Sequence, residues 1–187
     1  IKKYWSLTPQ ERKESDLGHL ENLLRDAVSL RTRSDVPYGA YLSGGVDSSL
    51  VVQHLSSIEQ GCKTFTAVIN DKELNEKEYA SIVADKCRTN HTDIFVNYDE
   101  IKLNFLRKLV RHFGQPFADS SIIPTYLISN KISSNVTVAL GGDGSDEVFC
   151  GYNKYNNPEK PITERFFRNT NLDFLEDDYK NDTYDYM

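Results

Sequence analysis

Two short glycine-rich stretches contain most of the residues that could do chemistry in this sequence. The first, Ser43–Ser49, lies between an apolar run and a second apolar run that begins at Leu50. Gly44 and Gly45 allow a sharp turn and a close approach of the backbone to a ligand, because glycine has no Cβ. The N–H groups that open a following helix have no partners within it, so an anion binds well there. The stretch therefore predicts a phosphate-binding loop between a strand and a helix.

Asp47 adds a carboxylate to this otherwise anion-binding loop. A carboxylate beside a phosphate repels it unless a cation lies between them, which indicates a Mg²⁺ ligand. The hydroxyl groups of Ser43 and Ser48 supply further hydrogen-bond donors. The loop lacks the lysine and the glycine spacing of GxxxxGK[ST], so it is not the phosphate loop of common ATPases. A Gly-Gly turn capped by Ser and Asp is the alternative without a function.

The second stretch, Gly141–Glu147, has three glycines and three carboxylates. Such crowded acids disfavour a bare phosphate, but they favour a phosphate bridged by Mg²⁺, or they accept protons. If the two stretches lie side by side, Asp47 and Asp146 can share one metal ion. An Asp- and Gly-rich surface turn is the alternative, whereas the spacing of an EF-hand calcium loop is absent.

Helical and strand patterns alternate along the chain. Helices are predicted over 17–33, 46–58, 75–87, 98–113 and 121–133, and strands over 38–42, 64–69, 92–96 and 136–140. Such alternation indicates right-handed crossovers and a parallel sheet covered by helices on both faces, which is an α/β fold in three layers. Ligands of such sheets lie beyond the carboxyl ends of the strands, where both glycine-rich stretches are predicted.

Composition narrows the class of protein. A length of 187 residues suits one domain with a substantial core, and the net charge of −6 argues against binding to nucleic-acid backbones. No apolar run is long enough to span a bilayer, and no secretory signal pattern opens the chain. Three cysteines without CxxC spacing indicate free thiols in a reducing compartment, so we expect a cytoplasmic protein. The histidines lack metal-ligand spacing and are expected to be structural, with His91 alone considered as a neighbour of the nucleotide.

Both stretches resemble motifs of known families. Ser43–Ser48 resembles the SGGxDS loop of the ATP pyrophosphatase family, and Gly142–Tyr152 is similar to the G[ED]G[SG]DE[LIV]FxGY signature of asparagine synthetases. Pro116–Ser129 is similar to the segment that precedes the same strand in that family, and Tyr4–Trp5 looks like the junction before its synthetase domain. The resemblance covers residues 1–155 strongly and the remainder weakly. It implies a fold of the adenine nucleotide alpha hydrolase type.

The family pattern implies roles for individual residues. The residues that would bind ATP are Leu42, Ser43, Gly44, Gly45, Asp47, Ser48, Ala67, Gly141 and Gly142. Asp47 and Asp146 would bind Mg²⁺, and Asp143 would accept a proton as ammonia attacks the acyl-adenylate. Ala67 replaces the usual Val or Ile, and Gly141 replaces a frequent Ser, so two contacts differ here. The residues that would face the amino-acid substrate are Asp119, Ser120 and Ser121, although Ser120 could instead cap the following helix.

The activity that the resemblance implies has two steps. The side-chain carboxylate of aspartate attacks ATP and releases pyrophosphate, and ammonia from glutamine then gives asparagine and AMP. Two alternatives stay open: a related synthetase with another acceptor, as in beta-lactam synthetases or lasso-peptide cyclases, and a nucleotide-binding module without catalysis.

The resemblance also implies a domain organisation. Residues 1–12 would connect to an N-terminal glutaminase domain, 13–155 would form the synthetase domain, and 156–187 would begin a C-terminal helical portion. The glutaminase domain and a lysine of the helical portion, both used by the family, would lie outside these 187 residues. The expected partners are aspartate, ammonia and a glutaminase domain, with a homodimer possible and neither nucleic acid nor membrane.

Overall fold

The computed structural model describes residues 16–69, 75–97, 101–115, 119 and 121–152. Contacts between residues divide the chain into two compact units, Ile1–Gly142 and Asp143–Met187. The predicted connector, 1–12, and the predicted start of a helical portion, 156–187, lie outside the described residues. None of the described helices is long and apolar enough to cross a membrane.

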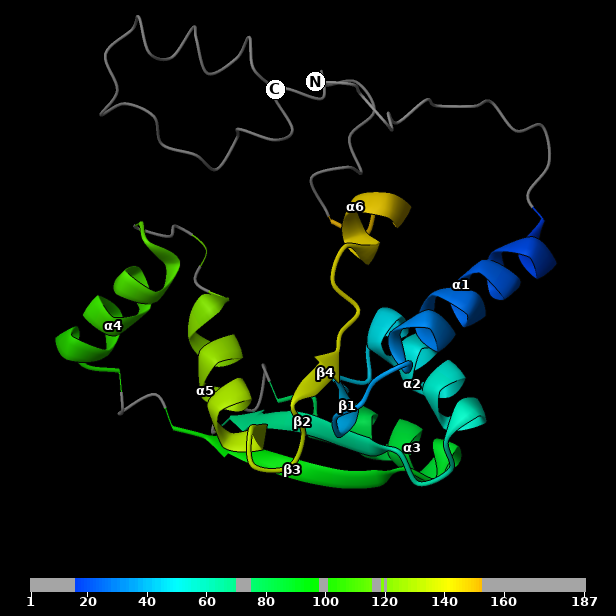
Figure 1. Cartoon of the computed structure of the whole chain (residues 1–187), viewed down its shortest axis with the longest axis horizontal. Helices are drawn as coiled ribbons and strands as arrows, with labels where there is room; N and C mark the ends of the chain where they lie inside the picture. The colour runs from blue at the N-terminus through cyan, green and yellow to red at the C-terminus, as the bar shows by residue number, and fades with distance from the viewer. Residues whose placement is uncertain (1–15, 70–74, 98–100, 116–118, 120, 153–187) are drawn as a thin grey trace, which may run out of the picture. The chain divides into compact units, whose positions relative to one another are not determined.

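The first unit is built on a parallel sheet of four strands. They are β1 (Tyr38–Tyr41), β2 (Lys63–Ile69), β3 (Asn90–Val96) and β4 (Val138–Leu140), in the order β3-β2-β1-β4. The chain moves outward from β1 to β2 and β3, then returns to the opposite side of β1 as β4 (Figure 1). In open parallel sheets, the point where strand order reverses is where a crevice forms at the carboxyl ends. Here that point lies between β1 and β4.

Helices cover both faces of this sheet. They are α1 (Leu17–Arg31), α2 (Val46–Ile58), α3 (Lys77–Cys87), α4 (Leu103–Phe113) and α5 (Ile122–Ile132). In Figure 1, α2 and α3 lie on one face with α1 outside α2, whereas α5 lies on the other face. The Phe105 ring of α4 meets Tyr126 of α5 edge to face, with ring centroids 5.3 Å apart. The predicted three-layer α/β fold with a parallel sheet is therefore confirmed.

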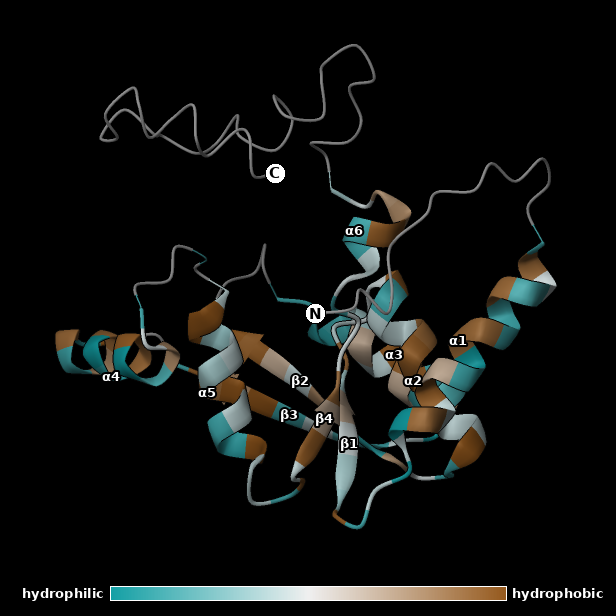
Figure 2. Ribbon diagram, turned by 45° about the horizontal axis from the view of Figure 1, so that its top comes forward, coloured by the Kyte–Doolittle hydropathy of each residue, from teal (hydrophilic) through white to brown (hydrophobic). Residues whose placement is uncertain are grey.

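Two clusters of buried side chains fill the space between the sheet and the helices on its two faces. The cluster between the sheet and α1–α3 includes Leu42, Val52, Leu55 and Ala80, and the cluster under α5 includes Phe65, Ile128, Ile132 and Val136. Figure 2 shows apolar and polar residues on the same helices, notably α1 and α4, as expected for helices that bury one side. Burial of these apolar side chains is the main force that holds the glycine-rich stretch after β1 in place.

The element boundaries differ modestly from the predicted ones. Helix α2 has the predicted bounds, whereas α3 begins at Lys77 and α4 at Leu103. The later start of α3 follows from local chemistry, since the Asn75 side chain accepts a hydrogen bond from the Lys77 N–H at 3.2 Å. A short helix in the second unit, α6 (Ser145–Phe149), was not predicted. It follows Gly144, whose left-handed backbone (φ 89°) ends the preceding stretch.

Candidate functional site

The first glycine-rich stretch connects β1 to α2 as predicted. Leu42 continues the sheet pairing through its N–H, which donates to the Phe65 carbonyl at 2.9 Å. Gly44 has a left-handed backbone (φ 83°), and Gly45 is the N-cap of α2 without a side-chain cap. The opening N–H groups of α2 thus have neither a partner within the helix nor a capping side chain from Gly45. This is the geometry of a helix N-terminus that binds an anion.

Two serine hydroxyls hold this loop in shape. Ser43 Oγ and Ser48 Oγ lie 2.9 Å apart, and the Ser43 N–H donates to Ser48 Oγ at 3.2 Å. The Gly45 N–H donates to Ser43 Oγ at 3.2 Å, and the Ser48 hydroxyl donates to the Gly45 carbonyl at 3.3 Å. Both hydroxyls were predicted to contact phosphate, and in this structure they bond within the loop. Their network keeps the loop folded before a ligand binds.

Helix α3 supports the loop from outside, a contact that was not predicted. A Cβ at Gly44 would lie 2.5 Å from the Ala80 nitrogen and 2.5 Å from the Tyr79 carbonyl carbon. These are backbone atoms that cannot give way, so the loop fits against α3 only with glycine there. Ala80 is fully buried at this contact. The small size of Ala80 is the one feature of the sequence that agrees with this contact. Alanine is too common in helices for that feature to predict the contact.

The second glycine-rich stretch begins beside the first. Since β4 pairs with β1, Gly141 and Gly142 leave the sheet next to the loop that follows β1. A Cβ at Gly142 would lie 2.9 Å from the Asp47 Cβ and 3.0 Å from the Ser48 nitrogen. The start of α2 and the stretch after β4 therefore meet at the switch point of the sheet. The missing side chain of Gly142 lets the two backbones approach this closely, and half-buried Asp47 brings a carboxylate to the same place.

These residues fit a phosphate group accompanied by a divalent cation. The helix N-terminus, with the bare backbone of Gly142 beside it, suits the anion, while Asp47 suits a hard cation with oxygen ligands. Leu42 and Ala67 are placed differently. The Leu42 side chain is only 1% exposed and packs in the first buried cluster, and Ala67 packs beside the cluster under α5. Contact of their side chains with a nucleotide stays a prediction.

The second unit contains the other predicted acidic residues. Asp143 is exposed, and Asp146 is half-buried in the first turn of α6. The Gly151 N–H donates to the Asp146 carbonyl at 3.0 Å, and Gly151 approaches this residue so closely that a Cβ there would clash with its carboxylate. The Tyr152 hydroxyl donates to Glu147 Oε1 at 2.8 Å. These contacts give part of the second stretch a local structural role, and the catalytic and metal-binding roles of Asp143 and Asp146 stay predictions.

The predicted substrate-facing residues lie before α5. Asp119 Oδ1 accepts a hydrogen bond from the Ser121 N–H at 2.9 Å, and this bond holds the pKa of Asp119 below its usual value. Ser121 is the N-cap of α5, while Ser120 lies outside the described residues. Asp119 therefore stabilises the start of the helix, as an acidic residue near a helix N-terminus does. Whether these residues also face a substrate stays a prediction.

His91 belongs to the opposite end of the sheet. It pairs with Thr64 near the amino end of β3, whereas both glycine-rich stretches leave the carboxyl ends. Its Nδ1 lies 2.9 Å from the Thr64 hydroxyl, and burial lowers the pKa of the imidazole. His91 contributes hydrogen bonds within the sheet, and its position at the end opposite both glycine-rich stretches does not favour the idea that it lies near a nucleotide bound there.

The sequence of this chain matches a known protein family and several of its members. A family model described as asparagine synthase matches residues 19–183. The chain is 34% identical over 149 residues to asparagine synthetase [glutamine-hydrolyzing] 1 of Bacillus subtilis, covering 80% of this chain and 23% of that protein. It is 39% identical over 153 residues to putative asparagine synthetase [glutamine-hydrolyzing] 2 of Methanocaldococcus jannaschii, covering 80% and 30%. The chain thus spans less than a third of the length of these relatives.

Among solved structures, the chain is similar to an NH3-dependent NAD synthetase from Campylobacter jejuni. The two are 16% identical with a TM-score of 0.47, and the match covers 74% of this chain and 61% of that one.

Proposed function

The chain belongs to the asparagine synthase family, and we propose on that premise that it carries the ATP-binding and adenylating part of an amide-forming ligase. The observation that carries the proposal is the meeting of Gly142 with Asp47 and Ser48 at the switch point of the sheet. Nucleotides bind well at the switch point of a parallel sheet, because backbone N–H groups and small residues there let phosphate oxygens approach closely.

We assign the pyrophosphate part of ATP to the opening turn of α2. The N–H groups of Val46, Asp47 and Ser48 lack acceptors within the helix, and the positive end of the helix dipole lies there. The Ser43 and Ser48 hydroxyls can rotate their hydrogens from the loop toward a phosphate oxygen. A Mg²⁺ ion held by Asp47 would neutralise charge on the pyrophosphate as it leaves. Its sharing with Asp146 stays a prediction from the sequence.

The proposed reaction joins a carboxylate to an amine. The β-carboxylate of aspartate attacks the α-phosphorus of ATP, so the bond between the α- and β-phosphates breaks and pyrophosphate leaves. Ammonia then attacks the acyl carbon of the adenylate, and AMP leaves as asparagine forms. The chain's own contribution is positioning and charge stabilisation at the α2 N-terminus. Asp143 is proposed to accept a proton from the attacking ammonia. Glutamine hydrolysis in a glutaminase domain is the proposed ammonia source.

Replacing Asp47 tests the proposal directly. Calorimetric titration should show that the unmodified chain binds ATP in the presence of Mg²⁺. Its affinity for ATP should fall by about tenfold or more when EDTA removes the metal. Asp47→Asn should bind ATP with the weaker affinity whether or not Mg²⁺ is present. Asp85→Asn, an exposed carboxylate on α3, is the matched control and should behave like the unmodified chain. ATP affinity that is independent of both Mg²⁺ and Asp47 would refute the assigned site.

The substrate needs a separate measurement in the full-length protein that contains this chain. Isotope exchange between pyrophosphate and ATP should depend on added aspartate, since exchange requires the acyl-adenylate to form reversibly. Exchange that another carboxylate supports and aspartate does not would overturn the substrate while leaving the ATP site intact.

A further inference from the structure

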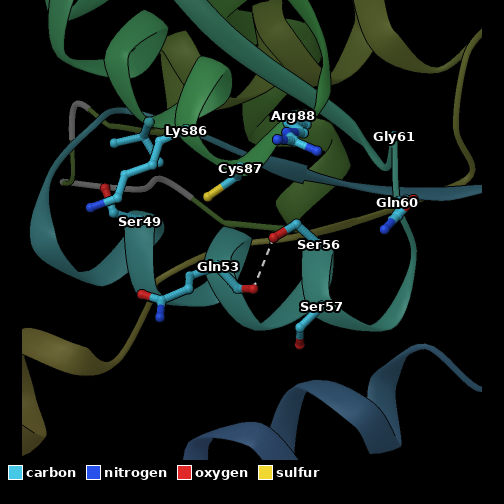
Figure 3. Close-up of a pocket in the computed structure, with 10 residues that line it drawn as sticks. Ser49, Gln53, Ser56, Ser57, Gln60, Gly61, Lys86, Cys87 and Arg88 are labelled. Atoms are coloured by element: carbon cyan, nitrogen blue, oxygen red, sulfur yellow. Dashed lines mark hydrogen bonds between the residues drawn. The ribbon is translucent and has the colours of Figure 1, made fainter.

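A second hollow lies away from the glycine-rich stretches, between helices α2 and α3 (Figure 3). It is lined on one side by a polar row on α2 that includes Ser49, Gln53 and Ser56, and on the other by the last turn of α3. Its volume of about 660 Å³ lies within the range of small-molecule pockets. We call it the α2–α3 groove, and the nucleotide site proposed above does not use it.

The side chains in the α2–α3 groove suit a negatively charged ligand. Lys86 and Arg88 both line it, and none of the described residues that line it is acidic. In Figure 3, Lys86 extends toward the Ser49 end of the groove, whereas Arg88 lies at the other end behind Cys87. Two cations of this kind, one compact and one a planar fork of donors, attract carboxylate or phosphate oxygens.

The backbone of Arg88 points to the same conclusion. Arg88 is the C-cap residue of α3 and has a left-handed conformation (φ 53°, ψ 45°) that glycine or asparagine usually adopts after a helix. Its N–H bonds back to the carbonyls of Ala84 and Asp85, which fixes this conformation. This fixed backbone keeps the Arg88 side chain in the lining of the groove.

An unpaired hydroxyl provides a third observation. Ser49 Oγ is shielded from solvent and has no hydrogen-bond partner among the described residues. A buried polar group without a partner is costly, and native proteins pair nearly all such groups with protein, water or a ligand. Ser48, one residue earlier, differs because its hydroxyl bonds within the phosphate loop. The Ser49 hydroxyl therefore gains a partner only when a ligand displaces the side chains that shield it from the groove.

We propose that the α2–α3 groove binds a small anionic molecule, with Lys86 binding its oxyanion group and Arg88 adding positive charge at the other end of the groove. Gln53 supplies neutral hydrogen-bonding groups on the opposite wall, and the Ser49 hydroxyl joins it once the side chains that shield it move. The ligand is defined by this chemistry: a phosphate or carboxylate on a molecule small enough for the groove.

Alkylation of Cys87 reports occupancy of the groove, because this thiol is partly buried in its lining. The experiment uses the whole chain with Cys150→Ser, since Cys150 is exposed. Cys62 does not interfere, because it is 1% exposed and burial raises the pKa of its thiol to about 11. Inorganic phosphate and succinate are the two probes, and chloride at matched ionic strength sets the unprotected rate of iodoacetamide labelling.

At least one probe should slow Cys87 labelling saturably, by about fivefold at a concentration of four times its dissociation constant. The probe that protects identifies the anion as phosphate or carboxylate. Lys86→Gln with Arg88→Gln should abolish this protection. Lys102→Gln with Arg111→Gln removes the same charge from α4 and should keep it.

The double variant could fold poorly because Arg88 has a left-handed backbone, so Lys86→Gln is also tested alone. Lys86 lies in ordinary helix, and this single substitution should weaken the protection of Cys87 by itself. Two results would overturn the proposal: neither probe slows labelling more than chloride does, or the α4 variant loses protection as fully as the groove variant.

Discussion

At the scale of the residue, two glycines shape the candidate site because they have no side chain. Gly44 meets the backbone of α3, and Gly142 meets Asp47 and Ser48, so in each case a Cβ would overlap atoms that cannot move freely. The neighbouring hydroxyls of Ser43 and Ser48 then close the loop by hydrogen bonds. Close approach and preorganisation at this loop therefore depend on a few specific residue types, not on a general preference of loops for glycine.

Substituting Gly142 tests this close approach. Gly142→Ala should push the stretch after β4 away from α2, costing about 1–3 kcal/mol of unfolding free energy by overpacking. ATP affinity should fall by about tenfold, because the added methyl group displaces the opening turn of α2, which is proposed to bind the pyrophosphate. Chemical denaturation and ATP titration measure the two effects.

Gly61→Ala is the matched control for this substitution. It has open space around its Cβ position but a left-handed backbone (φ 71°). It should therefore cost about 1–2 kcal/mol through backbone strain while leaving ATP affinity unchanged. Equal ATP affinity in Gly142→Ala and the unmodified chain would contradict the proposal that ATP binds where Gly142 meets α2.

At the scale of the element, β3 is anchored to β2 and α3 by a polar network. The Thr64 hydroxyl lies 2.8 Å from the Thr89 hydroxyl and 2.9 Å from His91 Nδ1. Asp93 lies 3.5 Å from His91 Nε2 and forms an ion pair with Lys77 of α3 at 2.6 Å. Because Thr64 is fully buried, this network fixes the register of two strands and the start of the helix that supports the glycine-rich loop after β1.

The network predicts a pH dependence of stability. Burial lowers the pKa of His91 from 6.5, which outweighs the opposite effects of Asp93 and Asp85, while Lys77 lowers it further. The unfolded chain therefore binds more protons than the folded one once the pH falls below about 6.5, so the unfolding free energy should decrease there.

Denaturation at pH values from about 7.5 to about 5 should show a smaller loss of stability in His91→Gln than in the unmodified chain. His19→Gln, on an exposed position of α1, should keep the unmodified profile. A steeper loss in His91→Gln would mean that protonated His91 stabilises the fold, contrary to this account.

At the scale of the whole first unit, two apolar layers hold the helices to the sheet. Phe65 is the largest fully buried side chain, and it packs against Ile128, Ile132 and Val136 under α5. The opposite layer joins Leu42 at the end of β1 to α2 and α3. Since the glycine-rich loop lies between β1 and α2, its position depends on both layers being intact.

Truncating Phe65 should destabilise this unit strongly. Phe65→Ala should lower the unfolding free energy by roughly 3–5 kcal/mol through lost burial and a cavity. Phe95→Ala removes the same side chain from a site that is 66% exposed on β3, where Lys77 lies 5.9 Å from the ring centroid. It should cost about 1 kcal/mol or less. Denaturant midpoints compare the two, and similar losses would show that the α5 layer contributes little.

The local features of this chain could be read from the sequence, because they depend on neighbours in the chain. Apolar periodicity predicted the described strands and helices α1–α5. The predicted ends of some elements were wrong by a few residues, for example where the Asn75 side chain bonds to the first turn of α3. Glycine spacing and Asp47 predicted a phosphate loop, and the motif around Gly142 predicted the family. The short helix α6 was missed because its sequence is also that of a turn.

The order of the strands was decided only by tertiary structure. Periodicity says that a segment is a strand, but pairing depends on which faces pack together across the fold. The return of β4 to the side of β1 brings Gly142 to Asp47, and the packing of α3 brings Ala80 to Gly44. The same packing leaves His91 at the far end of the sheet and opens the groove between α2 and α3. Contacts between residues so distant in the chain arise from burial of shared surfaces, and no local pattern encodes them.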